Sequence, residues 1–353
     1  MHAPRDGAPE RRALRRSPRV ARRPASRRAR RHRRGGGVAA DAAPRVVFLG
    51  TPAFALPPLD ALARLQQRGR IDLVGAITQP DRPGHRGRIT SPPVKERALA
   101  CGVHVLQPAR LRGGALRGIL ELRPDALVWA AYGNLVPAAL LDAVGGRALN
   151  VHPSLLPRWR GAEPIAHAIL AGDARTGVTL MEGTAELDAG AIVAQEEVEI
   201  GGSETTGELE ERLARLGGEM LERDLPLYLE GEIVPRPQDP GNATWAPKLD
   251  PKGGALDLEK PADELARIVR AYTPDPGAFT TFRGQRIGVR RASVAGGAPA
   301  QHGVVALRGG VPHLAAGAGW LRLDEVKPAG KRAMSGADWA RGARGLEGAT
   351  LPS

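Results

Sequence analysis

Residues 45–65, RVVFLGTPAFALPPLDALARL, decide the fold class of this chain. The stretch begins with a short apolar run of β-prone residues at 45–49, which ends at the turn Gly50-Thr51-Pro52. Apolar residues then recur at helical spacing, at Phe54, Leu56, Leu59, Leu62 and Leu65. The predicted order is therefore strand, turn and helix.

The same alternation continues along the chain. Apolar runs of strand length follow at 71–77, 126–131 and 148–151, with helical segments between them. Strands that alternate with helices predict an α/β fold with a doubly wound, mostly parallel sheet. Ligands of such sheets bind at the carboxyl ends of the strands. Gly50 begins no G-x-G-x-x-G pattern, so a dinucleotide site is not indicated.

The pattern changes after residue 175. Two short strands are predicted at 177–181 and 191–195, followed by an amphipathic helix at about 204–225 that Pro226 is expected to end. Pro and Gly residues then interrupt regular structure, which predicts a linker. Beyond a short helix at 262–272, alternating runs between Gly-rich turns predict a small all-β barrel. These runs lie at 278–282, 286–292, 303–307 and 320–326.

Five segments follow from this pattern, and 353 residues suffice for two globular domains. They are an Arg-rich extension at 1–44, an α/β domain at 45–230, a linker at 231–250, a barrel domain at 251–345 and a tail at 346–353.

The positive charge of the chain is concentrated in the extension. Residues 1–44 hold 14 Arg against three acidic residues, which accounts for +11 of the net charge of +13 and leaves +2 for the rest. Overall charge is therefore weak support for nucleic-acid binding by the body of the protein. The extension itself fits a nucleic-acid-binding arm, an organelle transit peptide, or translated sequence upstream of the true start.

A single cysteine, Cys101, excludes an intramolecular disulfide and fits a reducing compartment, so a cytoplasmic location is expected. No run approaches the roughly 18 apolar residues of a membrane-spanning helix, and no apolar secretory region follows the N-terminus. The scattered His residues give no metal-ligand spacing, so no metal is expected. We also expect a monomer without a membrane partner.

Asn150 and His152 are candidate catalytic residues because positions i and i+2 of a strand point to the same side. An amide that donates to an oxyanion, beside an imidazole that exchanges protons near neutral pH, suits acyl transfer to an amine. Asp188 is a candidate for the carboxylate that orients the imidazole. Taken alone, Asn150 and His152 also fit a loop cap and a satisfied histidine, and Asp188-Ala189-Gly190 fits a turn.

Three motifs set these residues in context: NVHPSLLPRWRG at 150–161, TGVTLM at 176–181 and LDAGAI at 187–192. Together they resemble the folate-dependent formyltransferase family. The resemblance implies an enzyme that transfers the formyl group of 10-formyltetrahydrofolate, without a metal, and a Rossmann-like domain followed by an OB-like barrel. It implies Asn150 as oxyanion donor, His152 as acid/base group and Asp188 as its orienting partner.

The resemblance also implies the folate-binding residues. One wall of the pocket matches Ser154, Leu155, Leu156 and Pro157, and another matches Tyr132 and Gly133.

Over nearly all of residues 45–345 the chain is similar to those family members that formylate the methionyl amine of initiator tRNA for translation initiation. The stretches VFLGTPAFA at 47–55, TQPDRPGHRGR at 78–88, TWAPKL at 244–249 and VKPAGKRAMSGADW at 326–339 carry this likeness. It implies initiator methionyl-tRNA as partner. The implied tRNA-binding residues are Arg82, Arg86, Arg88, Lys95 and Lys248.

Two other functions stay open from the sequence. The same three catalytic candidates would serve formyl transfer to glycinamide ribonucleotide or an amino-sugar nucleotide, or hydrolysis of the formyl folate. A non-catalytic RNA-binding protein is the alternative from another class, and residues 1–44 with the barrel suggest it.

Overall fold

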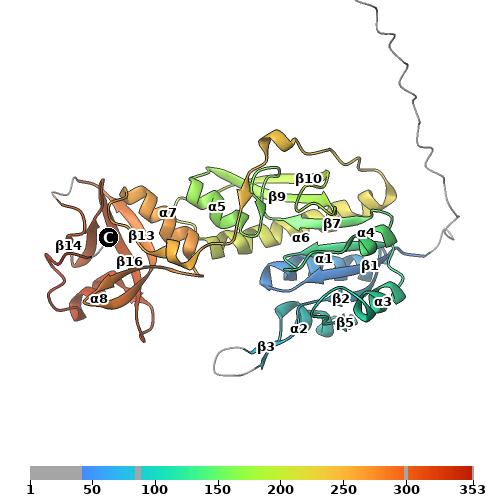
Figure 1. Cartoon of the computed structure of the whole chain (residues 1–353), viewed down its shortest axis with the longest axis horizontal. Coiled ribbons are helices and arrows are strands. Elements are labelled where there is room, and N and C mark those ends of the chain that lie inside the picture. The colour runs from blue at the N-terminus through green and yellow to red at the C-terminus, as the bar shows by residue number, and fades with distance from the viewer. Residues whose placement is uncertain (1–41, 84–88, 298–300, 352–353) are drawn as a thin grey trace, which may run out of the picture. The chain divides into compact units, whose positions relative to one another are not determined.

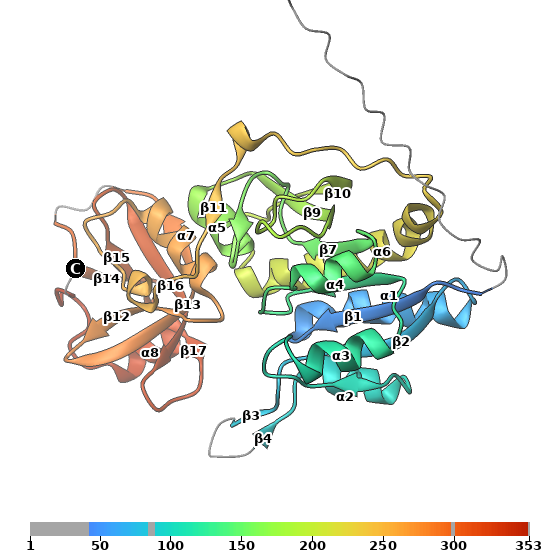
Figure 2. The ribbon, with the colours of Figure 1, turned by 45° about the vertical axis from the view of Figure 1, so that its right-hand side comes forward.

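A seven-stranded sheet in the order β10-β9-β7-β6-β1-β2-β5 forms the centre of the N-terminal half (Figures 1 and 2). The computed structural model describes residues 42–83, 89–297 and 301–351. The five strands from β7 to β5 run parallel, and β9 and β10 are added antiparallel at one edge. The strands are β1 (Arg45–Gly50), β2 (Asp72–Ile77), β5 (Val105–Leu106), β6 (Ala126–Ala130), β7 (Ala148–His152), β9 (Arg175–Glu182) and β10 (Ile192–Glu199).

Helices cover both faces of this sheet, which is why β1 is apolar at every central position. Val46 and Phe48 pack into the core shared with α1, α2 and α6, whereas Val47 and Leu49 pack against α3 and α4. A strand buried on both faces is typical of a parallel sheet. The helices are α1 (Leu56–Gln67), α2 (Pro93–Ala100), α3 (Gly114–Glu121), α4 (Ala138–Ala143), α5 (Pro164–Ala171) and α6 (Thr206–Glu230).

Pro226 does not end α6, so that prediction was wrong. The helix continues to Glu230 and ends at Gly231, whose φ of 78° gives a left-handed C-cap. The ring of Pro226 removes one backbone N–H in the last turns. Packing holds those turns in place, because Leu225 is buried and the Tyr228 hydroxyl donates to the Gly146 carbonyl at 3.2 Å.

The C-terminal half is an antiparallel sheet in the order β12-β13-β16-β15-β14, with β17 paired to β16. Its strands are β12 (Ala278–Phe282), β13 (Gln285–Ala295), β14 (Val305–Arg308), β15 (Val311–Ala315), β16 (Trp320–Pro328) and β17 (Met334–Ser335), and its helices are α7 (Ala262–Tyr272) and α8 (Gly336–Gly342). The predicted fold class was a Rossmann-like domain with a mostly parallel sheet followed by a small OB-like barrel, and it is confirmed by a mostly parallel α/β domain followed by an antiparallel β domain. The sequence pattern missed β15, which contains Pro312.

The predicted linker contains regular structure. A short strand β11 (Trp245–Ala246) pairs in parallel with β8 (Arg160–Gly161), and Arg236 exchanges backbone hydrogen bonds of 2.7 and 2.8 Å with Ile192. The predicted linker therefore runs beside two of the sequence motifs, those at 150–161 and 187–192. The described part of the predicted tail, residues 346–351, also packs, because Leu346 and Leu351 are buried.

Some predicted segments lie outside the described residues. These are residues 1–41 of the extension, residues 84–88, which include Arg86 and Arg88, and residues 352–353 of the tail. The short strands β3 (Arg82–Pro83) and β4 (Ile89–Thr90) are described on either side of the second gap. None of the helices within the described ranges is long and apolar enough to cross a membrane.

Candidate active site

The structure brings Asn150, His152 and Asp188 together. Asn150 and His152 lie at the carboxyl end of β7, and Asp188 lies in the loop between β9 and β10. The Oδ1 atom of Asp188 is 3.5 Å from Asn150 Nδ2 and 3.8 Å from His152 Nδ1. All three residues are buried. An amide, an imidazole and a carboxylate therefore meet where an α/β sheet usually binds its ligand.

The main-chain carbonyl of Trp159 fixes the tautomer of His152. Its oxygen lies 3.0 Å from His152 Nε2, and a carbonyl only accepts hydrogen bonds, so Nε2 carries the proton. The basic nitrogen of the neutral ring is then Nδ1, which faces Asp188. In the neutral ring Nδ1 carries no hydrogen, and its 3.8 Å separation from Oδ1 is too long for a direct hydrogen bond, so the hydrogen bond to Trp159 is the contact that orients the ring.

Asp173 holds Trp159 in this position. The indole Nε1 donates to Asp173 Oδ2 at 2.8 Å, and Arg158 donates to both carboxylate oxygens at 2.8 and 2.7 Å. The Arg158 guanidinium also lies 4.3 Å from the centre of the Trp159 ring. Trp159 has a φ of 62°, an unusual value that such contacts help to maintain. The sequence pattern gave no sign of Asp173.

The second carboxylate oxygen of Asp188 is fixed by the main chain. Its Oδ2 accepts from the Gly161 N–H at 2.9 Å, which leaves Oδ1 directed at Asn150 and His152. Asp188 has a φ of 50°, a left-handed conformation that Asp tolerates better than most residues. Asp188 therefore belongs to the predicted turn and also supplies the predicted carboxylate.

The predicted folate-binding segment packs closely against β9 and β10. Ser154 Oγ donates to the Arg158 carbonyl at 2.7 Å, and the Leu156 carbonyl accepts from Gln195 at 2.8 Å. Leu155 and Pro157 are half-buried. The polar groups of Ser154 and Leu156 are thus bonded within the protein.

The other predicted folate wall lies beside the end of β6. Burial raises the pKa of Tyr132, whose side chain is almost fully buried. Gly133 has a φ of 81°, and no atom lies within 4 Å of where a Cβ would be. The main chain at Gly133 is therefore open on the side where other residues carry a side chain.

The predicted tRNA-binding residues differ in their surroundings. Arg82 and Lys248 are exposed, whereas Lys95 forms an ion pair of 2.6 Å with Asp81. Hydrogen bonds from Gln107 and then Lys95 lower the pKa of Asp81. The charge of Lys95 is therefore partly neutralised by its own domain.

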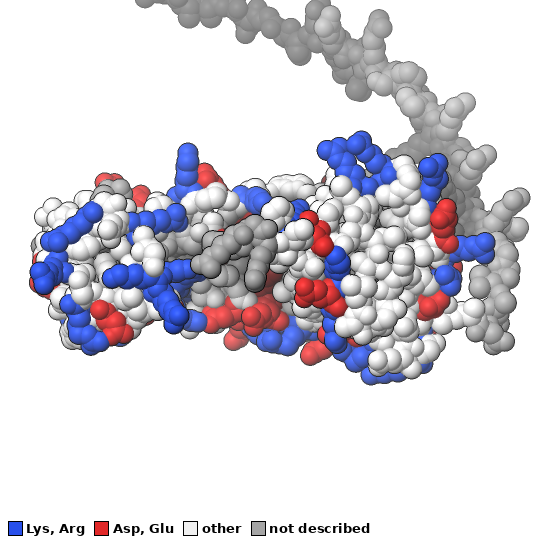
Figure 3. Space-filling view, turned by 90° about the horizontal axis from the view of Figure 1, so that it is seen from below, with Lys and Arg blue, Asp and Glu red and all other residues white. Residues whose placement is uncertain are grey.

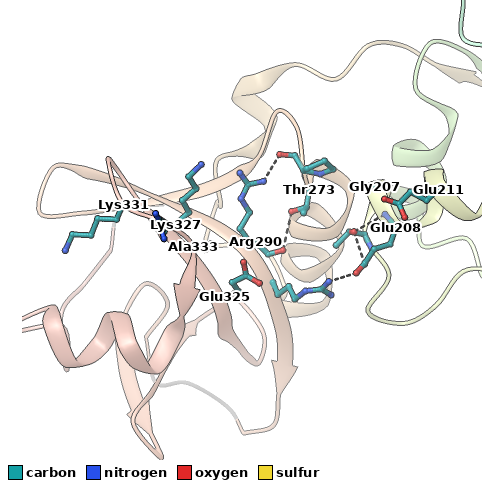
Figure 4. Close-up of a pocket in the computed structure, with 13 residues that line it drawn as sticks. Gly207, Glu208, Glu211, Thr273, Arg290, Glu325, Lys327, Lys331 and Ala333 are labelled. Carbon is teal, nitrogen blue, oxygen red and sulfur yellow. Dashed lines mark hydrogen bonds and ion pairs between the residues drawn. The ribbon is translucent and has the colours of Figure 1, made fainter. Parts of the chain in front are cut away.

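A cleft of about 640 Å³ lies elsewhere, at the N-terminus of α6 and the adjoining face of the β domain (Figure 4). An ion pair between Glu208 and Arg291 crosses it. Its basic lining residues are Arg290, Arg291, Lys327, Lys331 and Arg332. Figure 3 shows Lys and Arg side chains gathered over the β domain. The three catalytic candidates do not line this cleft, so it is a separate surface.

Potential metal ligands do not cluster in the part of the chain that the structure describes: no group of three His, Cys, Asp or Glu side chains there is arranged to hold an ion. At the site itself, Asn150, His152 and Asp188 can form hydrogen bonds to a ligand, and the imidazole can also transfer a proton.

The fold and two family models together identify the chain as a formyl transferase. The family model described as Formyl transferase matches residues 44–225, and the one described as Formyl transferase, C-terminal domain, matches residues 248–344. The chain belongs to the methionyl-tRNA formyltransferase family, as its relatives show. It is 45% identical to the methionyl-tRNA formyltransferase of Myxococcus xanthus over 301 residues, covering 85% of this chain and 95% of the relative. The enzyme of the same name from Halorhodospira halophila is 43% identical, with coverage of 87% and 98%.

Solved structures of low identity show the same fold. The N-formyltransferase of Helicobacter canadensis, in complex with folinic acid and dTDP-3-aminofucose, matches with a TM-score of 0.63 at 14% identity, covering 79% of this chain and 98% of that one. HypX of Aquifex aeolicus, in complex with tetrahydrofolic acid, matches with a TM-score of 0.58 at 18% identity, covering 86% and 48%.

Proposed function

We propose that this protein transfers the formyl group of 10-formyltetrahydrofolate to the amino group of the methionyl moiety of initiator methionyl-tRNA, for translation initiation. The observation that carries the proposal is the position of Asp188 Oδ1, which faces both the Asn150 amide and the His152 imidazole. It occurs in a chain that shares 45% identity with a methionyl-tRNA formyltransferase over 85% of its length.

The proposed reaction begins when the unprotonated methionyl amine attacks the formyl carbon. A bond forms between the amine nitrogen and that carbon, and the carbonyl oxygen becomes an oxyanion. Asn150 Nδ2 donates a hydrogen bond to it, an interaction that contributes about 3 kcal/mol in comparable oxyanion sites.

Proton transfer completes the step. His152 Nδ1 accepts the proton that the amine loses, and the neighbouring Asp188 carboxylate stabilises the imidazolium that forms. The bond between the formyl carbon and the folate nitrogen then breaks, and His152 returns the proton to that nitrogen. The products are the formylated amine and tetrahydrofolate.

We place the folate against Tyr132 and Gly133 on one side and against Ser154–Pro157 on the other. The open main chain at Gly133 suits the close approach of a flat ring. Leu155 and Pro157 supply the half-buried apolar surface that such a ring requires.

We place tRNA phosphates along Arg82, Lys95, Lys248 and the basic side of the cleft in Figure 4. Arg86 and Arg88 are proposed on sequence alone, since they lie outside the described residues. The domain limits 45–230 and 251–345, a monomeric state and a cytoplasmic location are part of the same proposal.

The acceptor is tested by incubating the protein with 10-formyltetrahydrofolate and one acceptor at a time. The acceptors are charged initiator methionyl-tRNA, uncharged tRNA, glycinamide ribonucleotide and an amino-sugar nucleotide. Formylated product from the charged tRNA alone is expected. Product from another acceptor, or folate hydrolysis without product, would move the function to that reaction, and RNA binding without turnover would support the non-catalytic alternative.

A further inference from the structure

Gln238, in the predicted linker, contacts the loop that carries Asp188. Its Nε2 donates to the main-chain carbonyls of Asp188 at 2.9 Å and of Gly190 at 2.8 Å. Its Oε1 accepts from Arg160 Nε at 3.1 Å and Arg160 Nη2 at 2.8 Å. Neither Gln238 nor Arg160 has a part in the chemistry described above.

The hydrogen-bonding capacity of this amide is fully used. A Gln amide has two N–H donors and an oxygen with two lone pairs, and all four are engaged by Arg160 and the two carbonyls. The reverse orientation would place the amide oxygen against the carbonyls and the amide N–H groups against a guanidinium. The surroundings therefore allow one orientation, and a Glu in this position would supply no donor.

Arg160 makes the contact rigid. It is only 4% exposed, and its Nη1 lies 3.5 Å from Glu186, which belongs to the same loop as Asp188. A buried guanidinium is unfavourable unless hydrogen bonds and a counter-charge compensate it. Gln238 and Glu186 supply these, so Arg160, Gln238 and the loop are held as one unit.

The loop needs an external support of this kind. Asp188 has a left-handed φ of 50°. A Cβ on Gly190 would lie 1.7 Å from the Glu182 carbonyl, which shows how tightly the chain folds back on itself. Such conformations persist where surrounding contacts maintain them.

We propose that Gln238, together with Arg160, is a positioning residue for the transfer reaction. It fixes the main chain of Asp188 so that Oδ1 faces Asn150 and His152 while Oδ2 meets the Gly161 N–H. The inference rests on the proposed function, because it requires Asp188 to belong to the reacting set. It also makes the segment at 231–250 a part of the active-site scaffold.

The test uses Gln238→Ala and Gln238→Glu, each in the wild-type chain and in an Asp188→Asn chain. Asp239→Ala is the matched control, because its hydrogen bonds run to Gly241 and Asn242 within the linker. Formyl transfer to methionyl-tRNA is measured in a single turnover with enzyme in excess, KM is measured for both substrates, and thermal unfolding checks the fold.

Both Gln238 variants are expected to lower the transfer rate about tenfold or more, while the KM for each substrate stays within twofold of the wild-type value. Asp239→Ala is expected to leave the rate unchanged. In the Asp188→Asn chain the same Gln238 substitutions should change the rate less than twofold, because their effect passes through that carboxylate.

Three results would overturn the inference. If Asp188→Asn lowers the rate but the Gln238 variants match the wild type, the positioning role is wrong and the proposed function stands. An equal loss in both backgrounds would show a general structural role. An Asp188→Asn chain as fast as the wild type would remove the carboxylate from the mechanism, and the positioning role with it.

Discussion

Gly161→Ala should damage both stability and catalysis, because Gly161 serves two structural roles. Its φ is 119°, and a Cβ on it would lie 2.7 Å from the Ala246 carbonyl oxygen in the adjoining strand β11. Its N–H is also the donor to Asp188 Oδ2. The substitution must therefore separate β8 from β11 and move the N–H that holds the carboxylate.

The magnitude follows from these contacts. A non-glycine residue in this conformation costs about 1–3 kcal/mol. Separating the strands weakens the bonds from Arg160 N to Thr244 O and from Ala162 N to Ala246 O, each worth about 0.5–1.5 kcal/mol net. Together these terms predict a loss of about 2–6 kcal/mol in the free energy of unfolding. A displacement of Asp188 near 1 Å can lower turnover by as much as about 100-fold.

Urea unfolding and the formylation rate are measured together, with Gly102→Ala as control. Gly102 also has a positive φ, of 72°, but nothing lies within 4 Å of the position of its Cβ. The control should lose about 1 kcal/mol and keep full activity. A Gly161→Ala protein as stable and as active as the control would refute the reasoning about β8, β11 and Asp188.

Two further predictions concern the N-terminus of α6 and the tRNA surface. Hydrogen bonds from the Thr205 main chain and, second, from Arg291 lower the pKa of Glu208 from 4.5 to about 2. The charge of Glu208 therefore stabilises the fold fully above pH 4.5, and this stabilisation is lost as the pH falls toward 2. Glu208→Gln should lower the free energy of unfolding at pH 7 by only about 0.5 kcal/mol, because the Glu208 side chain is 45% exposed and solvent screens its charge. A difference in thermal midpoint between the variant and the wild type that stays constant down to about pH 3 would contradict this. Lys248→Ala should weaken binding of charged and uncharged tRNA alike and reduce the slope of log affinity against log salt by about 0.7–0.9, whereas an unchanged slope would remove Lys248 from the phosphate contacts.

Local patterns predicted six of the seven strands of the N-terminal sheet, missing only the two-residue strand β5, and they indicated Asn150 and His152 as catalytic candidates. The apolar run of β1 and the spacing of Asn150 and His152 both reflect the alternation of side chains along a strand, which the sequence displays directly. Asp188 was found through its motif, because no spacing rule connects it to residues almost 40 positions earlier.

The residues that support the site depend on tertiary contacts that a local pattern does not contain. Gln238 lies in a Pro-rich stretch with no periodicity, and its partners are 48, 50 and 78 residues away. Asp173 reaches Trp159 across 14 residues. Pro226 was misread for a related reason, because packing of Leu225 and Tyr228 maintains a helix that local preference would end.

The most direct test of the central claim is the single-turnover rate of formyl transfer from 10-formyltetrahydrofolate to initiator methionyl-tRNA by His152→Ala. His313→Ala is the matched control, since His313 is also buried and bonded to a main-chain carbonyl but lies in β15. Loss of the proton-transfer group should lower the rate about 10²- to 10⁴-fold and leave the dissociation constant for methionyl-tRNA within twofold, while the control keeps its rate. A His152→Ala protein that transfers the formyl group as fast as the wild type would contradict the account.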